Sequence, residues 1–440
     1  MTLRLAGSTL IFAALGTAGH MVPPKLTYYK DIVPLLQKNC QGCHRPGEAV
    51  PMALMSYQEV RPWAKAMKTA VLSRKMPPWF ADPHVGTFTN DRRLSEAEMT
   101  TISKWADAGA PEGRIKDAPK PVPFAEGWTI GKPEAVFEMP EAAAIPAKGT
   151  IEYTYFIVPT NFTEDKWVQF AESRPGNRAL VHHIIVYARD PQSKWLRQYP
   201  VGKAFIPQKG GGSGEVGGQF ITGFAPGAPP EALRPGQGKL VKAGSDLVFQ
   251  MHYTANGTAG QDRSKVGLIF AKEPPAQRVL TLAAGNGKFS IPPGAPAHAV
   301  NGSMTLYQDT ELIGLLPHMH LRGKSMEMRA VYPDGKVEKL LWVPNYDFNW
   351  QLWYQVPRGK VLPKGTRIEA TGTFDNSANN KNNPDPAATV LPGDQSWEEM
   401  MLGFFNVAFD AKLDPLSILR APKKVTETKQ SGQPSSGGGE

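Results

Sequence analysis

The chain has 440 residues, which is long enough for about three domains of ordinary size. Its 43 glycines and 41 prolines are spread along the chain, which favours many short strands and turns over disorder. The net charge is +9 with lysine and arginine scattered, which argues for solubility and against nucleic-acid binding. The two cysteines, Cys40 and Cys43, are three residues apart, which leaves none for structural disulfides or for a blue-copper thiolate.

Residues 1–20 have the features of a secretory signal peptide. Arg4 provides the positive charge, Leu5 to Leu15 provide a short apolar core, and Thr17-Ala18-Gly19 provide a cleavage region. The apolar core is too short to span a membrane comfortably, and no other stretch reaches about eighteen uninterrupted apolar residues. We therefore expect a periplasmic or secreted protein. The alternative is an uncleaved segment that tethers the chain to the membrane.

The segment Cys40-Gln41-Gly42-Cys43-His44 is the attachment motif of c-type haem. Two thiols at this spacing can bond both vinyl groups of a haem, and His44 then lies under the iron. A redox disulfide is the alternative for a bare Cys-x-x-Cys, but the histidine and the secretory start favour haem. The sequence therefore predicts one covalent haem c, which carries one electron.

Short helices are expected on both sides of the haem motif. Residues 31–36 form a helical pattern with proline in the first turn. Ser95 and Glu98 form a capping box before a second helix, which continues until Gly109. Two terminal helices around a haem resemble a small class I cytochrome c, so we assign residues 21–115 to a haem domain.

The sixth ligand of the haem iron should be a thioether or another imidazole. We favour Met76, because Pro77 and Pro78 hold an extended loop that can cross the haem face. Cytochromes c often place their distal methionine before a proline in this way. His84 is the rival ligand, and the remaining methionines near it are expected in the core: Met52, Met55 and Met67.

Helical periodicity nearly vanishes after a proline-rich linker. Short, partly alternating segments such as residues 151–158 follow at regular spacing and are separated by turns. A break near Glu273-Pro274-Pro275 divides this region into halves. We predict a small all-α haem domain followed by two all-β, antiparallel, jelly-roll-like sandwich domains. The expected boundaries are 116–124 for the linker, 125–273 and 274–420 for the sandwiches, and 421–440 for a disordered tail.

Several histidines lie inside strand-like apolar segments, where an imidazole without a partner costs stability. His318 and His320 alternate along a strand, so both rings can face one metal ion while Met319 points away. His182 and His183 are adjacent, so they can reach one ion only where the backbone bulges or twists.

Four motifs follow one another in this region. They are His182-His183, Gln250-Met251-His252-Tyr253, His318-Met319-His320-Leu321-Arg322-Gly323 and Glu399-Met400. In this order they resemble the copper type II, ascorbate-dependent monooxygenases, and the resemblance covers roughly two-thirds of the chain. In that family one copper is held by three histidines and the other by two histidines and a methionine, each in its own sandwich domain.

The resemblance implies two copper sites in this chain. The implied ligands are His182, His183 and His252 for the electron-transfer copper, and His318, His320 and Met400 for the copper that activates oxygen. Imidazole suits copper in both oxidation states, and a thioether favours Cu(I). Met400 is preferred to Met401 because it follows Glu399, as the family's methionine follows its glutamate. Gln250 is either an orienting residue of the first site or a surface amide.

Two features depart from the family pattern. The animal enzymes are rich in disulfides, whereas this chain has no cysteine outside the haem motif. The peptide-amidating enzyme keeps a carboxylate-binding arginine just before the His-x-His pair, whereas Leu315 and Leu316 stand before His318 here. The resemblance therefore does not extend to a peptide carboxylate, and the sequence does not name the substrate.

We expect a periplasmic haem–copper monooxygenase that hydroxylates a C–H bond of an organic substrate with dioxygen. Its electrons would come from a periplasmic donor or an ascorbate-like reductant and pass through the haem domain. Two other functions remain open at this stage. One is a non-catalytic electron-transfer or copper-binding protein, and the other is a zinc hydrolase that uses His318 and His320.

Overall fold

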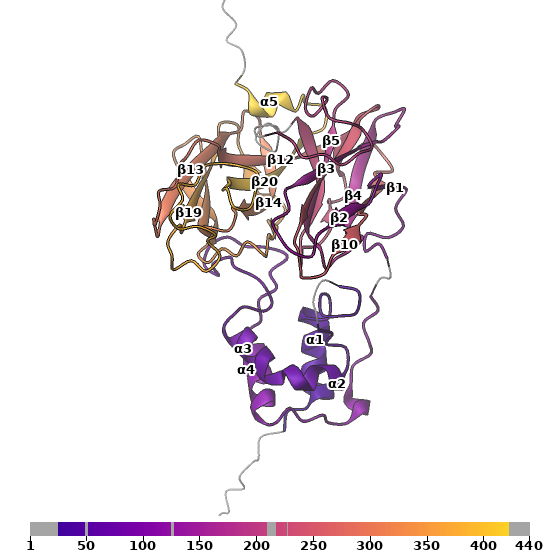
Figure 1. Cartoon of the computed structure of the whole chain (residues 1–440), viewed down its shortest axis with the longest axis vertical. Coiled ribbons are helices and arrows are strands. Elements are labelled where there is room, and N and C mark those ends of the chain that lie inside the picture. Colours follow the sequence, from indigo (N-terminus) through magenta and orange to yellow (C-terminus); the bar gives the residue numbers. More distant parts are fainter. Residues whose placement is uncertain (1–24, 49–51, 125–126, 209–216, 227, 422–440) are drawn as a thin grey trace, which may run out of the picture.

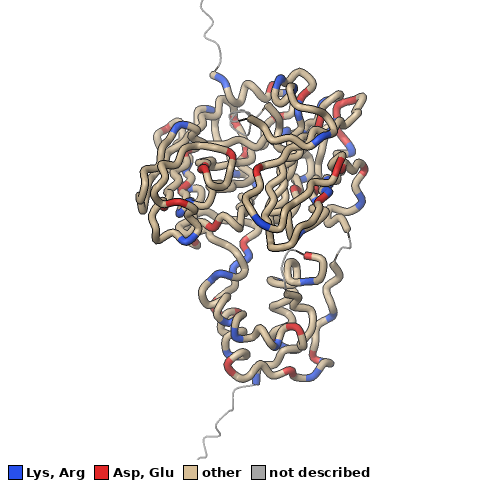
Figure 2. Tube along the Cα trace, in the orientation of Figure 1, with Lys and Arg blue, Asp and Glu red and all other residues tan. Residues whose placement is uncertain are grey.

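The structure is a computed structural model that describes residues 25–48, 52–124, 127–208, 217–226 and 228–421 (Figure 1). The expected signal peptide lies outside the described residues, as does nearly all of the expected disordered tail. None of the helices in the described ranges is both long and apolar enough to cross a membrane. Lysine and arginine are scattered over the molecule, in agreement with their spacing in the sequence (Figure 2).

Short helices form the N-terminal part of the described chain (Figure 1). They are η1 (Tyr28–Ile32), α1 (Val33–Asn39), α2 (Tyr57–Val60), η2 (Arg61–Trp63), α3 (Ala64–Leu72), α4 (Glu96–Asp107) and η3 (Ile115–Asp117). Side chains such as Leu36, Met67 and Trp105 pack into one buried cluster. The predicted capping box is confirmed, because Ser95 and Glu98 each accept the other's backbone N–H. We call this part the helical module.

The first β half follows the linker. Its strands are β1 (Ala135–Glu138), β2 (Ala143–Ile145), β3 (Thr154–Pro159), β4 (Lys166–Arg174), β5 (Val181–Arg189), β6 (Gly218–Phe224), β7 (Glu231–Ala232), β8 (Gln237–Val241), β9 (Asp246–Tyr253), β10 (Gly260–Asp262) and β11 (Lys265–Phe270). The strands β1-β11-β4-β8 form, in this order, one end of a ten-stranded sheet that continues into the second half, and a separate four-stranded sheet has the order β3-β9-β5-β6. Phe156 and Phe249 from one sheet and Val168 from the other belong to one buried cluster, so the sheets pack face to face.

The second β half repeats this arrangement. Its elements are β12 (Gln277–Asn286), β13 (His298–Thr305), β14 (Thr310–His318), β15 (Gly323–Val331), β16 (Val337–Val343), β17 (Tyr354–Gln355), β18 (Val361–Leu362), β19 (Arg367–Phe374), β20 (Met401–Asp410) and α5 (Leu416–Leu419). The strands β12-β20-β14-β17 continue the ten-stranded sheet, and β13-β19-β15-β16 form a separate four-stranded sheet. Leu315, Met328 and Phe405 lie in the core between them.

The two halves also share backbone hydrogen bonds. Strands β8 and β12 pair in parallel over two residues, at Gln277 with Gln237 and at Arg278 with Gly238. The prediction of a predominantly β chain with a few short helices is confirmed.

One segment between α3 and α4 leaves the helical module. Residues 79–90 extend onto the second β half, where Trp79 and Ala81 join the buried core of that half. The N–H of Thr89 donates to the carbonyl of Gln355 at 2.9 Å. We call residues 79–90 the docking arm. The sequence placed this segment inside the haem domain and gave no sign of its contact with the second β half.

Candidate metal centres

Three histidines meet where β5 and β9 run side by side. In this ladder Val181 pairs with Tyr253 and His183 pairs with His252, so His182 is an additional residue of β5. Such a β-bulge rotates consecutive side chains out of strict alternation. The bulge that two adjacent histidines require is therefore present at the predicted place.

The Nδ1 atoms of these three rings converge. Nδ1 of His183 lies 3.2 Å from Nδ1 of His182 and 3.3 Å from Nδ1 of His252. Metal–imidazole bonds of about 2.0–2.1 Å at a tetrahedral angle place two nitrogens about 3.3 Å apart. The three ligand atoms lie within 4.8 Å of one another, so their spacing fits a single transition-metal ion.

The surroundings keep these imidazoles neutral. Burial disfavours the imidazolium form, and it lowers the pKa of His182 to about 4 and the pKa values of His183 and His252 well below 6.5. The buried ring of Tyr153 packs edge-on against His183 and His252, with centroid distances of 5.5 and 4.7 Å. At neutral pH all three rings therefore have a lone pair available for a metal.

His318 is the last residue of β14 and His320 lies two residues beyond it, and each has an oxygen near its Nδ1 atom. Nδ1 of His318 lies 2.8 Å from Oε1 of Gln351, and Nδ1 of His320 lies 3.3 Å from the carbonyl oxygen of Glu398. Protonation at Nδ1 lets each ring donate to its oxygen and leaves the lone pair of Nε2 for a metal. Burial lowers the pKa of His318 to about 4 and that of His320 to about 3.

Nε2 of His320 is a buried ring nitrogen that has no hydrogen-bond partner within the described part of the chain. Buried polar atoms of native proteins almost always have a partner, because leaving one unpaired costs about 1–3 kcal/mol. A metal ion bound at this nitrogen would supply the missing partner. The residues present therefore fit a metal at the second histidine group.

The methionines next to these histidines differ in burial. Met319 and Met401 are fully buried in the apolar core of the second half, so Met319 points away from the two imidazoles as predicted. Met400 is half-buried and directly precedes Met401, the first residue of β20. In the β14–β20 ladder, His318 pairs with Leu402, two residues after Met400.

Glu399 connects the histidine-bearing loop to the segment that carries Met400. One carboxylate oxygen accepts the N–H of His320 at 2.8 Å, and the other accepts the N–H of Arg322 at 2.7 Å. Burial raises the pKa of this carboxyl to about 8, although the hydrogen bonds and Arg322 oppose the rise. Glu399 thus fixes the position of the His318–Gly323 motif relative to the Glu399-Met400 motif.

The two histidine groups face each other across the junction of the β halves. The ring of Phe348 stacks on His182 at a centroid distance of 5.0 Å and lies 5.9 Å from the ring of His320. The centroids of His182 and His320 are therefore at most 10.9 Å apart, which is the sum of the 5.0 and 5.9 Å distances. Ser396, from the second half, lies 3.1 Å from Nε2 of His252 in the first.

The haem motif begins at the C-terminal end of α1. Cys40 follows the last residue of that helix, and its N–H donates to the carbonyl of Leu36. Burial raises the pKa of the Cys40 thiol to about 12 and also raises that of Cys43. His44 is buried, and its Nδ1 lies 3.3 Å from the carbonyl oxygen of Met52, which leaves Nε2 for the iron.

The predicted distal ligand lies just before the docking arm. Met76 is half-buried, and its N–H donates to the carbonyl of Ala70 at 3.1 Å, whereas His84 is an exposed residue of the arm itself. The assignment of Met76 to the haem iron stays a prediction. Its position means that one short segment carries both the distal ligand and the contact with the second β half.

Three methionines were expected in the core of the haem domain. Met67 is buried there as predicted, and Met52 is half-buried. The prediction is wrong for Met55, which is 39% exposed. Met55 directly precedes Ser56, the N-cap of α2, and its own N–H donates to the carboxylate of Glu59. A residue at this position outside a short helix faces solvent.

Gln250 was expected either to orient the first site or to lie on the surface. It is buried in β9, and its Nε2 donates to the hydroxyl of Tyr155, so the surface interpretation is wrong. The residues that contact the histidines directly were not singled out from the sequence: Tyr153, Phe348, Gln351 and Ser396. Nothing in their spacing connects them to the histidines, because the contacts arise only from folding.

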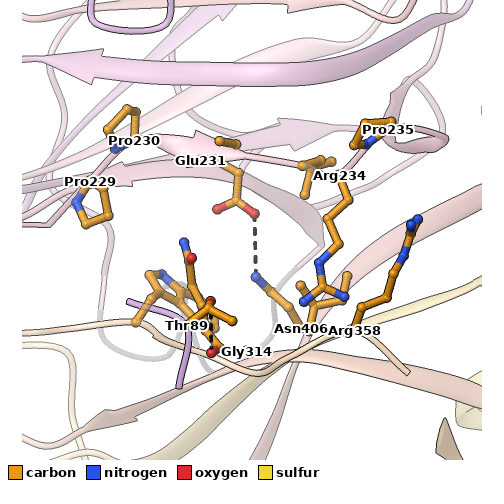
Figure 3. A pocket seen from close by; sticks show the side chains of 14 residues that line it. Thr89, Pro229, Pro230, Glu231, Arg234, Pro235, Gly314, Arg358 and Asn406 are labelled. Atoms are coloured by element: carbon orange, nitrogen blue, oxygen red, sulfur yellow. Dashed lines mark hydrogen bonds between the residues drawn. The ribbon is translucent and has the colours of Figure 1, made fainter. Parts of the chain in front are cut away.

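A separate cavity of about 350 Å³ lies between the two β halves (Figure 3). Its lining includes Glu231 and Arg234 of the first half, Arg358 and Asn406 of the second, and Thr89 of the docking arm. None of the predicted metal ligands lines this cavity, so it is distinct from the histidine groups.

Comparisons with known proteins give no family for this chain. No protein-family model matches it, and no curated protein matches it. Solved structures that align with it include the VP2 subviral particle of infectious bursal disease virus, with 10% identity over 66% of this chain and 75% of that chain and a TM-score of 0.18. PNGF-II aligns with 8% identity over 61% of this chain and 64% of that chain, with a TM-score of 0.26. At these TM-scores the alignments carry no argument about fold or function.

Proposed function

We propose that this protein is a haem–copper monooxygenase that hydroxylates a C–H bond of an organic substrate in the periplasm or outside the cell. The reaction consumes one dioxygen, two electrons and two protons, and it yields the alcohol and water. The two β halves are proposed to be jelly-roll-like sandwiches with one copper each. The main support is that a three-histidine cluster and a second buried histidine pair face one junction.

His182, His183 and His252 are the proposed ligands of the electron-transfer copper. Their converging Nδ1 atoms offer three neutral donors, a set that suits both Cu(I) and Cu(II). Nε2 of His252 is engaged by Ser396, which fixes the plane of this ring. The first site can therefore hold its geometry when the oxidation state changes.

His318, His320 and Met400 are the proposed ligands of the oxygen-activating copper, which would supply one-electron chemistry with dioxygen. The chain positions both imidazoles through their Nδ1 atoms, at Gln351 and at the Glu398 carbonyl. Both rings are buried, so little of either imidazole is accessible to water.

The helical module is proposed to carry a haem c on Cys40 and Cys43, with His44 and Met76 as axial ligands, which would supply single electrons. The segment that follows the haem motif contacts the first β half, where the Glu48 carboxylate lies 2.7 Å from the Arg178 guanidinium. Both side chains are about four-fifths buried, and Arg178 precedes His182 by four residues. This contact supports electron entry at the three-histidine site.

Metal analysis and oxygen uptake test the proposal. The purified chain should hold two coppers and one haem, and it should consume oxygen only with an organic substrate. A screen of small molecules should find such a substrate, and His318→Ala should abolish uptake while the three-histidine site still binds copper. Zinc in place of copper would favour the hydrolase. Two coppers with no substrate-dependent uptake across the screen would favour an electron-transfer protein.

A further inference from the structure

One loop contacts both histidine groups. Residues 344–355 connect β16 to the end of β17, and we call them the bridging loop. Phe348 stacks on His182 with an interplanar angle of 17°, and the side chain of Asn349 hydrogen bonds to the same imidazole. Three residues after Phe348, the Gln351 amide oxygen faces Nδ1 of His318 at 2.8 Å. The loop therefore touches the first histidine group and the second.

The start of the bridging loop also fixes the backbone between the two histidines of the second group. The Tyr346 hydroxyl donates to the carbonyl of Met319 at 2.6 Å and accepts the N–H of Met319 at 3.1 Å. Met319 is the residue between His318 and His320. Movement of the bridging loop would therefore shift both imidazoles of this group.

Residues 344–353 of the bridging loop belong to no strand, and the backbone holds them to a neighbouring strand at Tyr346, whose N–H donates to the carbonyl of Lys324 on β15 at 2.8 Å. A loop of this kind depends on side-chain contacts, and it opens more easily than the strands beside it. Contacts that immobilise the ends of the loop therefore decide how firmly Phe348 and Gln351 are positioned.

The docking arm provides such contacts at the C-terminal end of the loop. Asn90 Nδ2 donates to the carbonyl of Trp353 at 2.7 Å, and Asn90 Oδ1 accepts the N–H of Gln355 at 2.9 Å. The ring of Trp79 meets the ring of Tyr354 edge-on at 4.8 Å. The same arm belongs to the chain segment between α3 and α4, which Figure 1 shows rising from the helical module to the second β half.

We propose that the docking arm positions the bridging loop, so that the helical module controls the geometry of both histidine groups. Asn90 is the positioning residue, because its amide replaces the missing sheet partner of residues 353 and 355. The part of this inference that concerns copper binding rests on the proposed function. The mechanical coupling between Asn90, the loop and His318 does not depend on it.

The test compares Asn90→Ala with wild type in the full-length protein. Asn301→Ala serves as the control, because it also removes an asparagine side chain that forms a hydrogen bond, here with the Thr371 hydroxyl on β19, at an exposed position outside the docking arm. Hydrogen–deuterium exchange, read by mass spectrometry on metal-free protein, should rise about tenfold across residues 344–352 and 316–321 in Asn90→Ala. The control should leave exchange in both segments at the wild-type rate.

Copper binding gives the second measurement. In Asn90→Ala the affinity of the second histidine group for copper should fall by about tenfold, as expected when a partner of a ligand is loosened. The Cu(II) electron paramagnetic resonance spectrum of that site should change, while haem content and the far-ultraviolet circular dichroism stay the same. Asn301→Ala should retain the wild-type spectrum and affinity.

Two results would overturn the inference. One is faster exchange confined to residues 353–355, the backbone that Asn90 bonds directly, with residues 344–352 and 316–321 unchanged. The other is wild-type copper affinity and spectrum in Asn90→Ala. A wild-type protein that binds no copper at His318 and His320 would refute the proposed function instead, and the exchange comparison would still decide whether the arm positions the loop.

Discussion

The hydroxyl of Ser396 lies 3.1 Å from Nε2 of His252, and it joins the second β half to the three-histidine group of the first. The other ring nitrogen of His252, Nδ1, faces His183 at 3.3 Å. Nδ1 of His252 is therefore available for a metal, while Ser396 of the second β half contacts Nε2. The segment that leads to Met400 thus contacts both candidate metal centres.

Replacing Ser396 by alanine should weaken the three-histidine site. Without the hydroxyl, His252 loses the partner that fixes its orientation, and the affinity for copper should fall by about tenfold. Competition with a chelator measures the change, and Ser417→Ala, which removes a hydroxyl that donates to the backbone carbonyl of Asp414, is the control. An unchanged affinity in Ser396→Ala would show that the contact does not orient His252.

Met400 and Met401 should respond differently to the same substitution. Met400→Ile should remove a ligand of the second copper and abolish oxygenation, while the first site still binds copper and stability stays near wild type. Met401→Ile changes a fully buried core residue and should cost up to about 1.5 kcal/mol while copper binding remains. Copper stoichiometry and thermal unfolding separate the two, and the reverse pattern would place the ligand at Met401.

Glu399→Gln should destabilise the protein above about pH 8, where the Glu399 carboxyl is ionised. Both carboxylate oxygens accept backbone N–H groups, so the amide nitrogen of glutamine would face a donor in a buried position. Such a mismatch costs about 1–3 kcal/mol in the free energy of unfolding. Glu164→Gln, at an exposed ion pair with Lys166, should change it by less than about 1 kcal/mol. Chemical denaturation measures both, and equal stability of the two variants would contradict the assigned role.

The haem should remain attached when the protein is denatured. Cys40 and Cys43 are at the spacing that bonds two vinyl groups, so the haem band should survive denaturing electrophoresis. Cys43→Ser should lose normal attachment through two thioethers, which shifts the pyridine haemochrome spectrum. Haem that acidified solvent extracts from the native protein would refute covalent attachment.

Arg178→Ala should slow electron transfer from haem to copper. The substitution breaks the partly buried ion pair with Glu48, which holds the haem-motif segment against the strand that carries His182. Stopped-flow mixing of haem-reduced protein with oxygen and substrate should show slower haem oxidation with unchanged haem content. Arg61→Ala, at an exposed position of η2, is the control. Haem oxidation at the wild-type rate in Arg178→Ala would show that this contact is not the route.

The amino-acid sequence determined the features that depend on near neighbours in the chain. The spacing of Cys40, Cys43 and His44, the capping box at Ser95 and the alternation that buries Met319 all follow from local geometry. The bulge at His182 was a geometric necessity for two adjacent ligands, and the ladder contains it. These features are readable because the relevant distances are set by a few peptide units.

Only the tertiary structure decided what surrounds the histidines and how the parts meet. Ser396 and His252 are 144 residues apart in sequence, and Asn90 is 265 residues from Gln355. The sequence also did not determine burial at two single positions. Gln250, for which a surface position was one interpretation, is buried, and Met55, which was expected in the core, is exposed. Contacts of this kind depend on how whole sheets and loops pack, and no pattern of nearby residues encodes them. The physical reason is that burial and pairing across the junction are properties of the folded chain.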